Sequence, residues 1–227
     1  MHSVASEIPA SSLEQVVRVL EEEIVLGFLH PRERLVEDDL LERFGLKRHV
    51  VRQVLVELER MGLVERKRNV GALVRSYTAK EVEDLYAVRE LLECQCVRLI
   101  KFPVPEAALG RLIAIQTTHD ETVAAGDLRG AFRSNMQFHE VLFGLSDNNV
   151  LVAAIRDHAQ RAHSIRSSSL VISEQLERAR REHWSIIEAL RAGDADQLVQ
   201  LCTDHLKPSR DTYVSHYQLR DSQKASL

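Results

Sequence analysis

The sequence predicts a mainly α-helical protein in two parts: three short helices with a β-hairpin, followed by a bundle of six helices. Three observations lead to this prediction. Apolar residues recur at three- and four-residue spacing through most of the 227-residue chain, glycines and prolines separate the periodic stretches, and strand-like patterns are confined to residues 63–74. We therefore place one domain at residues 10–76 and a second, all-helical domain at residues 78–219.

Two helices are predicted at the start of the first domain. Ser11 or Ser12 is the expected N-cap of a helix that buries one valine- and leucine-rich face and ends at Gly27. After a proline-containing turn, a second and shorter helix covers residues 37–44 and stops at Gly45.

A third helix begins near Arg48 and ends at Gly62. Two short helices joined by a turn of a few residues are typical of a helix-turn-helix. Residues 63–74 then alternate around a polar turn, which predicts a β-hairpin wing. The first domain therefore has the pattern of a winged helix-turn-helix.

Charge is distributed unevenly although the net charge is only −4. Residues 10–42 hold 3 basic and 9 acidic side chains, residues 43–75 hold 9 basic and 3 acidic ones, and residues 76–227 hold 18 and 21. A basic segment beside an acidic one is expected of a localised polyanion-binding site. An unevenly charged, solvated surface is the alternative, and composition alone does not decide between them.

The residues of the first domain also follow a known pattern. In order they are Gly27, Pro31, Leu35-Val36-Glu37, Leu40, Phe44-Gly45-Leu46-Lys47-Arg48-His49-Val50-Val51-Arg52-Gln53-Val54-Leu55, Leu58, Gly62-Leu63-Val64 and Asn69-Val70-Gly71-Ala72-Leu73-Val74. This run resembles the GntR-family DNA-binding domain. It departs from that family where Lys47 replaces the usual Ser or Thr and His49-Val50 replaces the usual Thr-Pro. The resemblance implies operator binding, and the departures leave the preferred operator sequence open.

Candidate DNA-contacting residues gather at the start of the third helix and in the wing. Arg48 and Arg52 are four apart, so they share one helix face, opposite the buried stripe. The resemblance places them where arginines contact bases and phosphates, and a guanidinium can bind guanine O6 and N7 together. Exposed arginines that are merely solvated are the alternative. The predicted contact residues are Lys47, Arg48, His49, Arg52, Arg66, Lys67, Arg68, Asn69 and Gly71.

Six helical stretches are predicted in the second domain. Prolines, Gly-Asp pairs and an Asp-Asn-Asn turn separate them. We expect Gly193 to end one helix and Asp194 to cap the next, and we expect fraying after about Tyr217. The stretches are roughly 78–101, 105–126, 128–146, 148–167, 173–192 and 194–218.

Seven of the ten histidines follow residue 76, and three of them lie on apolar helix faces. A single histidine on such a face is usually a core residue with a satisfied hydrogen bond. His139, His183 and His205 fall on three different helices, which favours a common centre. His158 and His163 are weaker candidates for the same pocket.

Several short motifs of the second domain match another family. They are Tyr86-Ala87-Val88-Arg89-Glu90-Leu91-Leu92-Glu93, Phe138-His139, Asn149, the run from Glu182 to Asp194, and His205. These motifs resemble the FCD ligand-binding domain, which accompanies the GntR reader in the FadR subfamily. A count of six helices points to its VanR-like branch.

The FCD resemblance implies a divalent metal site and an effector. Many FCD domains bind the ion through three histidines and an aspartate, and His139, His183 and His205 match those histidines. Asn135 stands where the aspartate is expected, so a weaker site of three imidazoles remains, suited to Zn²⁺ or Ni²⁺. Arg89 matches an arginine positioned to bind a carboxylate effector; an ion pair with Glu93 is the alternative.

The expected function is therefore transcriptional regulation, most simply repression, by a homodimer on a short palindromic operator. A small organic acid bound beside the metal would change operator affinity. A regulator that senses the metal itself is one alternative. A metal-dependent hydrolase is another, but the sequence has no HExxH motif and the basic helix-turn-helix would be unexplained.

Cellular location is inferred from what the sequence lacks. It has no apolar stretch of membrane-spanning length and no signal-peptide pattern. Three cysteines, Cys94, Cys96 and Cys202, form no CxxC pair and read as reduced core or helix-face residues. We expect a cytoplasmic protein without membrane partners.

Overall fold

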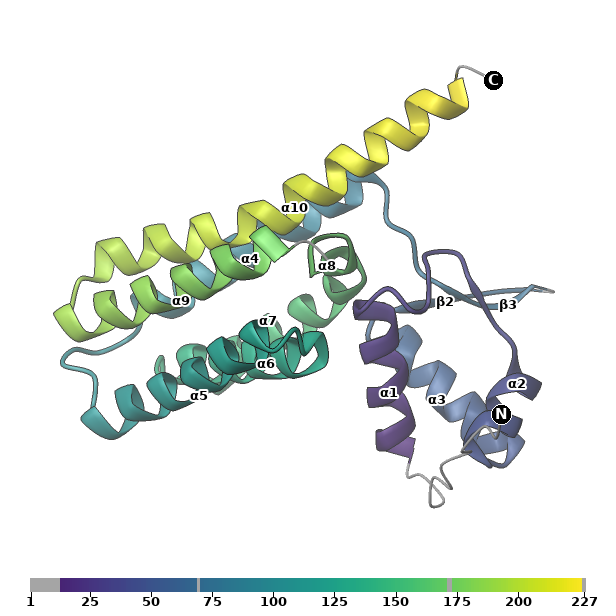
Figure 1. Cartoon of the computed structure of the whole chain (residues 1–227), viewed down its shortest axis with the longest axis horizontal. Coiled ribbons are helices and arrows are strands. Elements are labelled where there is room, and N and C mark those ends of the chain that lie inside the picture. Colours follow the sequence, from purple (N-terminus) through teal and green to yellow (C-terminus); the bar gives the residue numbers. More distant parts are fainter. Residues whose placement is uncertain (1–12, 69, 171–172, 226–227) are drawn as a thin grey trace. The chain divides into compact units, whose positions relative to one another are not determined.

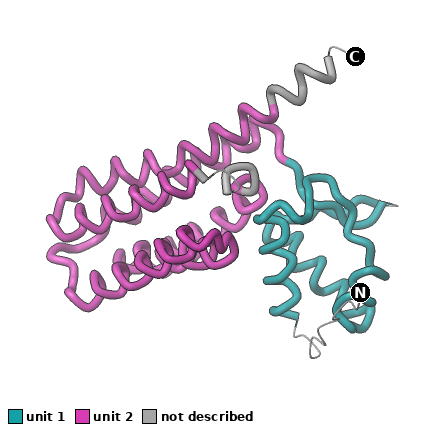
Figure 2. The backbone as a smooth tube through the Cα atoms, viewed as in Figure 1, with its two compact units in different colours: residues 1–76 teal, residues 77–227 magenta. Residues whose placement is uncertain are grey.

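A computed structural model describes residues 13–68, 70–170 and 173–225 of the chain. It divides into two compact units, residues 1–76 and 77–227 (Figure 2). The first unit is small and mixed, and the second is entirely helical in its described part.

The first unit is the predicted winged helix-turn-helix (Figure 1). Its strands pair antiparallel in the order β1-β3-β2, so the short β1 adds a third strand to the predicted hairpin. The expected N-caps Ser11 and Ser12 lie outside the described residues. Its elements are α1 (Leu13–Val25), β1 (Arg34–Leu35), α2 (Glu37–Phe44), α3 (Arg48–Arg60), β2 (Val64–Lys67) and β3 (Gly71–Val74).

One aliphatic core holds these elements together. Leu20 of α1 and Val54 and Leu58 of α3 are completely buried in it, because apolar residues repeat at helical spacing on the facing sides. Gly45 ends α2 with φ +62° and donates its N–H to the Leu41 carbonyl. This left-handed conformation, which glycine adopts at little cost, turns the chain sharply into α3.

The second unit is a bundle of helices. Figure 1 shows α10 running alongside α4, while α5 and α6 lie side by side and α9 contacts both α5 and α10. The helices are α4 (Ala79–Arg98), α5 (Glu106–Ala124), α6 (Leu128–Gly144), α7 (Asn149–Arg161), α8 (His163–Leu170), α9 (Ser173–Ala192) and α10 (Ala195–Ala225).

One predicted helix is divided in the structure. The stretch 148–167 forms α7 and α8, which meet at Ala162, so the described part of the bundle has seven helices where six were expected. Residues 162–165 are all buried. On a continuous helix four successive residues point around nearly the whole circumference, so burying all of them requires a change of direction.

The boundary between α9 and α10 lies where the sequence predicted it. Gly193 has φ +72°, and the Asp194 carboxylate accepts a hydrogen bond from the Gln197 N–H at 2.9 Å, which confirms the predicted helix end and N-cap. Helix α10 continues to Ala225, past Tyr217 where fraying was expected.

The three cysteines are buried in the second unit, as predicted, and form no disulfide. Burial raises the pKa of the Cys202 thiol well above its ordinary value, so this side chain behaves as a small apolar core residue. None of the helices in the described ranges combines the length and the hydropathy of a membrane span.

Candidate functional sites

The start of α3 presents its basic residues to solvent. Val51 and Leu55 face the core, which leaves the side chains of Arg48 and Arg52 about half exposed or more, at 53% and 63%. His49 is also exposed. Lys47 occupies the N-cap position in an extended conformation and makes no side-chain cap hydrogen bond, because lysine has no acceptor to offer.

Two acidic residues at the start of α2 bind these arginines. Arg48 Nη2 lies 2.6 Å from Asp38 Oδ1, and Arg48 Nη1 lies 3.4 Å from Glu37 Oε2. Arg52 Nε donates to Glu37 Oε2 at 3.2 Å. The hydrogen bond and charge of Asp38 raise the pKa of Arg48. This pairing was not predicted from the sequence, although three consecutive acidic residues at 37–39 indicate a negatively charged start of α2.

The wing carries cations that also contact glutamates. Arg66 Nε lies 2.6 Å from Glu59 Oε2, and Lys67 Nζ lies 2.7 Å from Glu65 Oε1. Arg68 is exposed near the wing tip. The remaining predicted wing residues are Gly71, which has φ +102° at the start of β3, and Asn69, which lies outside the described residues.

The structure brings His139, His183 and His205 together from α6, α9 and α10. One potential ligand nitrogen from each lies within 4.8 Å of the others. His139 Nε2 and His205 Nε2 are 3.2 Å apart. Two imidazole nitrogens bound to one Zn²⁺ at about 2.1 Å would be about 3.0–3.4 Å apart, for angles between about 90° and tetrahedral, so the spacing fits a shared ion.

A second layer of side chains orients two of these rings. His205 Nδ1 lies 2.7 Å from Glu182 Oε2, and His183 Nδ1 lies 2.8 Å from Gln116 Oε1. Both oxygens only accept hydrogen bonds, so each Nδ1 carries a hydrogen, and in a neutral ring this leaves the lone pair on Nε2. His183 Nε2 is buried without a hydrogen-bond partner among the described residues, as a metal-ligating atom would be in the absence of its ion.

Burial keeps the imidazoles in the form that binds metal. Burial lowers the pKa of both His139 and His183 well below the ordinary value of 6.5, and neighbouring positive charges act in the same direction. Burial acts to raise the pKa of Glu182, but hydrogen bonds from His205 and Arg178 lower it overall. The site therefore combines two neutral rings, His139 and His183, with an ionised carboxylate behind His205.

A cavity of about 70 Å³, with room for several water molecules or a small ligand, is lined by His205 of this cluster and by His119 of α5. Asn135, four residues before His139 on α6, lies in its wall. The cavity also has a cationic side from Arg166 and Arg178. The described lining residues are His119, Ala131, Phe132, Asn135, Arg166, Gln175, Leu176, Arg178, Ala179, Glu182, His205, Pro208 and Ser209.

Arg89, the predicted effector ligand, lies elsewhere in the core. It is 2% exposed, and its Nε donates to Glu93 Oε1 at 3.0 Å, so the ion pair considered as the alternative is present. Arg89 is absent from the described lining of the cavity. Arg166 lines the cavity instead, and burial together with the nearby positive charge of Arg89 lowers its pKa.

Helix α5 supplies the part of the site that the sequence did not reveal. Gln116, His119 and Asp120 are spaced by three and four residues, so they share a face, which was the only available signal. Two weaker candidates lie outside the described cavity lining: His158 bonds the Ala154 carbonyl of its own helix, and His163 packs edge-on against Phe132.

Comparisons with known proteins agree with this architecture. The FCD domain family matches residues 84–208, and the gntR family of bacterial regulatory proteins matches residues 13–74. The expected VanR-like branch is not tested by these matches, and the count of six helices from which it was predicted is wrong, because the described part of the bundle has seven.

Individual relatives cover most of the chain. It is 28% identical to the uncharacterized HTH-type transcriptional regulator YdhC of Bacillus subtilis, over 84% of this chain and 86% of that one. It is 24% identical to the HTH-type transcriptional repressor RspR of Escherichia coli, over 86% and 85%. A crystal structure from Rhodococcus sp. RHA1, named as a transcriptional regulator GntR, is 25% identical with a TM-score of 0.74 and covers 90% of this chain and 98% of its own.

These relatives and the gntR family are transcriptional regulators, which removes the hydrolase alternative. The chain belongs to the GntR family of bacterial regulatory proteins, with an FCD domain as its second part, and is a DNA-binding transcriptional regulator rather than an enzyme.

Proposed function

We propose that this regulator is a repressor whose operator affinity is set by a small carboxylate bound beside a divalent metal ion in the second unit. The observation that carries the proposal is the convergence of three histidines, one of which, His205, lines a cavity that Arg166 and Arg178 also line. A relative that matches most of the chain is named a repressor, which supports the sign of the effect.

His139, His183 and His205 would hold the ion, which we expect to be Zn²⁺ or Ni²⁺. Three neutral nitrogen donors favour these borderline ions over Mg²⁺ or Ca²⁺, which prefer oxygen ligands. Asn135 can add a carbonyl oxygen but no negative charge. When bound, the ion supplies a Lewis-acidic position that an anionic ligand can occupy.

A carboxylate would be neutralised from both sides of the cavity. We place its contact at Arg166, because this guanidinium lines the cavity whereas the Nε of Arg89 donates to Glu93. In this arrangement Arg89 contributes positive charge from behind Arg166 rather than the direct clamp that the sequence suggested. The effector class is accordingly a small organic acid.

The first unit would contact DNA bases and phosphates through α3, and the flanking backbone through the wing. Arg48 and Arg52 would exchange Glu37 and Asp38 for bases and phosphates, with Lys47 and His49 beside them. Because exposed ion pairs are weak, this exchange costs little. The wing residues proposed to contact the flanking backbone are Arg66, Lys67, Arg68, Asn69 and Gly71.

A homodimer would present two such readers to a short palindromic operator. Large apolar side chains on the second unit support this assembly: Leu91 of α4 is 70% exposed and Val150 of α7 is 82% exposed. Helices α4 and α7 contact each other, so a partner covering both could bury this surface.

The experiment that tests the proposal titrates operator binding under three conditions: metal-free protein, protein with Zn²⁺ or Ni²⁺, and metal-loaded protein with a panel of small organic acids. We expect an acid to weaken operator binding only when the ion is present. If no acid changes operator affinity but the ion alone does, the protein is a metal sensor. If neither changes it, the proposal is wrong.

A further inference from the structure

The inference concerns Gln116, a completely buried amide on α5. Its Oε1 accepts the Nδ1 hydrogen of His183, which lies 67 residues away in the sequence. A buried amide that meets no partner is destabilising, because it loses the hydrogen bonds that it would make with water, so its hydrogen bonds determine how it is oriented.

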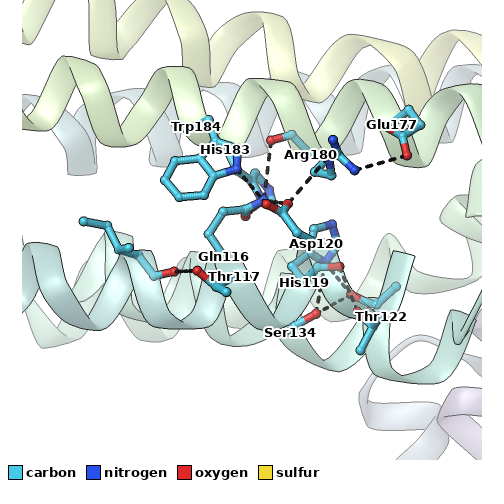
Figure 3. Close-up of polar contacts among 12 residues, drawn as sticks. Gln116, Thr117, His119, Asp120, Thr122, Ser134, Glu177, Arg180, His183 and Trp184 are labelled. Carbon is cyan, nitrogen blue, oxygen red and sulfur yellow. Dashed lines mark hydrogen bonds and ion pairs between the residues drawn. The ribbon is translucent and has the colours of Figure 1, made fainter. Parts of the chain in front are cut away.

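The orientation of the amide is set by a network between α5 and α9 (Figure 3). Gln116 Nε2 donates to Asp120 Oδ1 at 2.8 Å and reaches the Arg180 carbonyl at 3.5 Å. Asp120 Oδ2 accepts the indole N–H of Trp184 at 3.0 Å, and the Arg180 guanidinium lies 3.7 Å from Oδ1. Because both neighbours of Nε2 are acceptors, the amide cannot turn over without placing oxygen against oxygen.

With Oε1 directed at His183, the imidazole has one permitted neutral tautomer. Nδ1 carries the hydrogen and Nε2 carries the lone pair. The ring is also held in place by Phe138, which stacks on it with centroids 4.1 Å apart and an interplanar angle of 10°. His183 is fully buried, so water does not compete for either nitrogen.

We propose that Gln116 is a positioning residue: it fixes the tautomer and ring orientation of His183 so that Nε2 faces the other two histidines. Asp120, held by Trp184, locks the amide that does this. The proposal deepens the metal site of the proposed function and rests on it. The two rings then differ in the group that accepts their Nδ1 hydrogen: a neutral amide for His183 and a carboxylate for His205.

The test compares Gln116→Leu with Thr117→Val in the full-length protein. Thr117 is exposed, and its hydroxyl bonds only the Ile113 carbonyl among the contacts that the structure describes, so its variant controls for a change on the same helix. In metal-free protein, long-range ¹H–¹⁵N NMR should report the Nδ1–H tautomer of His183 in wild type and control. In Gln116→Leu this preference should be lost.

Metal titration gives the second readout. We expect Gln116→Leu to weaken Co²⁺ and Zn²⁺ binding by about 10- to 100-fold and to change the Co²⁺ absorption spectrum. The double variant Gln116→Glu/Asp120→Asn exchanges the carboxylate and amide, so the acceptor for His183 and the donor between the two positions are both kept. It should recover most of the affinity. A folded Gln116→Leu with wild-type tautomer and affinity overturns the inference.

If Gln116→Leu does not fold, Asp120→Ala decides the point, because it leaves Gln116 in place but removes the acceptor that orients it. A smaller loss of affinity and a mixed tautomer are expected, and an unchanged protein contradicts the inference. Should wild type bind no metal at all, the proposed metal site fails, while the NMR comparison still decides whether Gln116 positions His183.

Discussion

The proposed DNA-contacting surface of α3 and the cluster of His139, His183 and His205 both pair a nitrogen-bearing side chain with an oxygen acceptor, but one pairing is exposed and the other buried. The side chains of Arg48 and Glu37 are 53% and 33% exposed, whereas His183 and Gln116 are both completely buried. Exposed ion pairs contribute about 0–1 kcal/mol, so DNA can displace them. A buried acceptor that loses its partner costs about 1–3 kcal/mol, so the histidine cluster keeps one geometry.

The largest expected effect comes from removing the exposed arginines of α3. Arg48→Ala/Arg52→Ala should weaken operator binding by about 100-fold or more, because each arginine that reaches a base is worth about 1–3 kcal/mol. Fluorescence anisotropy on operator DNA measures the loss. Arg60→Ala, at the other end of α3, is the control and should bind like wild type. Wild-type affinity in the double variant would contradict the proposed reading surface.

A smaller effect is expected from restoring the carboxylate that Asn135 lacks at the proposed metal site. Asn135→Asp adds a carboxylate to the cavity wall and should raise Zn²⁺ affinity by about tenfold, since an anionic oxygen is a stronger ligand than an amide. Calorimetric titration gives the affinity. Gln137→Glu adds the same charge to an exposed position of α6 and should leave the affinity unchanged. Equal gains in both variants would assign the effect to general electrostatics.

The stability of the second unit should also depend on pH, through the buried His139 and His183. Burial holds the pKa of His139 and His183 below their ordinary value of 6.5, so below about pH 6.5 the unfolded chain binds protons that the folded chain does not. Stability is unaffected by this difference above pH 6.5 and falls as the pH drops toward the folded pKa values.

Thermal unfolding in chelator, from about pH 7.5 to about pH 5.5, should therefore show a declining Tm for the second unit. His139→Gln/His183→Gln removes the two titrating groups and should flatten that decline even though the protein is less stable. The same slope in this variant would mean that other groups cause it.

The smallest effect is expected from removing the acidic partner of the exposed arginines. Glu37→Gln removes the carboxylate that binds both arginines and should strengthen DNA binding by less than about fivefold, mainly at low salt. Anisotropy at several salt concentrations separates this from a change in specificity. Glu42→Gln, an exposed change of the same charge on α2, tests whether position matters. Equal effects of the two variants would show that only net charge is involved.

Periodicity and turn residues sufficed to predict most of the fold. Gly45, Gly62 and the pair Gly193-Asp194 mark helix ends because backbone conformation and capping are local properties. The break at Ala162 was missed because it depends on burying four successive residues against other helices, which no local pattern displays.

The candidate sites divide in the same way. His139, His183 and His205 could be grouped from the sequence because each lies on an apolar helix face and the FCD motifs align them. Their supports Gln116 and Glu182 were not foreseen, since a polar residue gains that role only through helix packing. Arg89 and Arg166 show the same limit: only Arg89 was predicted from the sequence, whereas helix packing places Arg166 in the cavity lining.

The central claim, that three histidines hold one divalent ion, has a direct measurement. Native mass spectrometry of protein purified without chelators and supplied with Zn²⁺ or Ni²⁺ should find one ion per chain in wild type. His139→Ala/His205→Ala should carry none, while His158→Ala, which alters a histidine outside the cluster, should carry one. A wild-type chain that takes up no ion, or a double variant that retains it, would contradict the account.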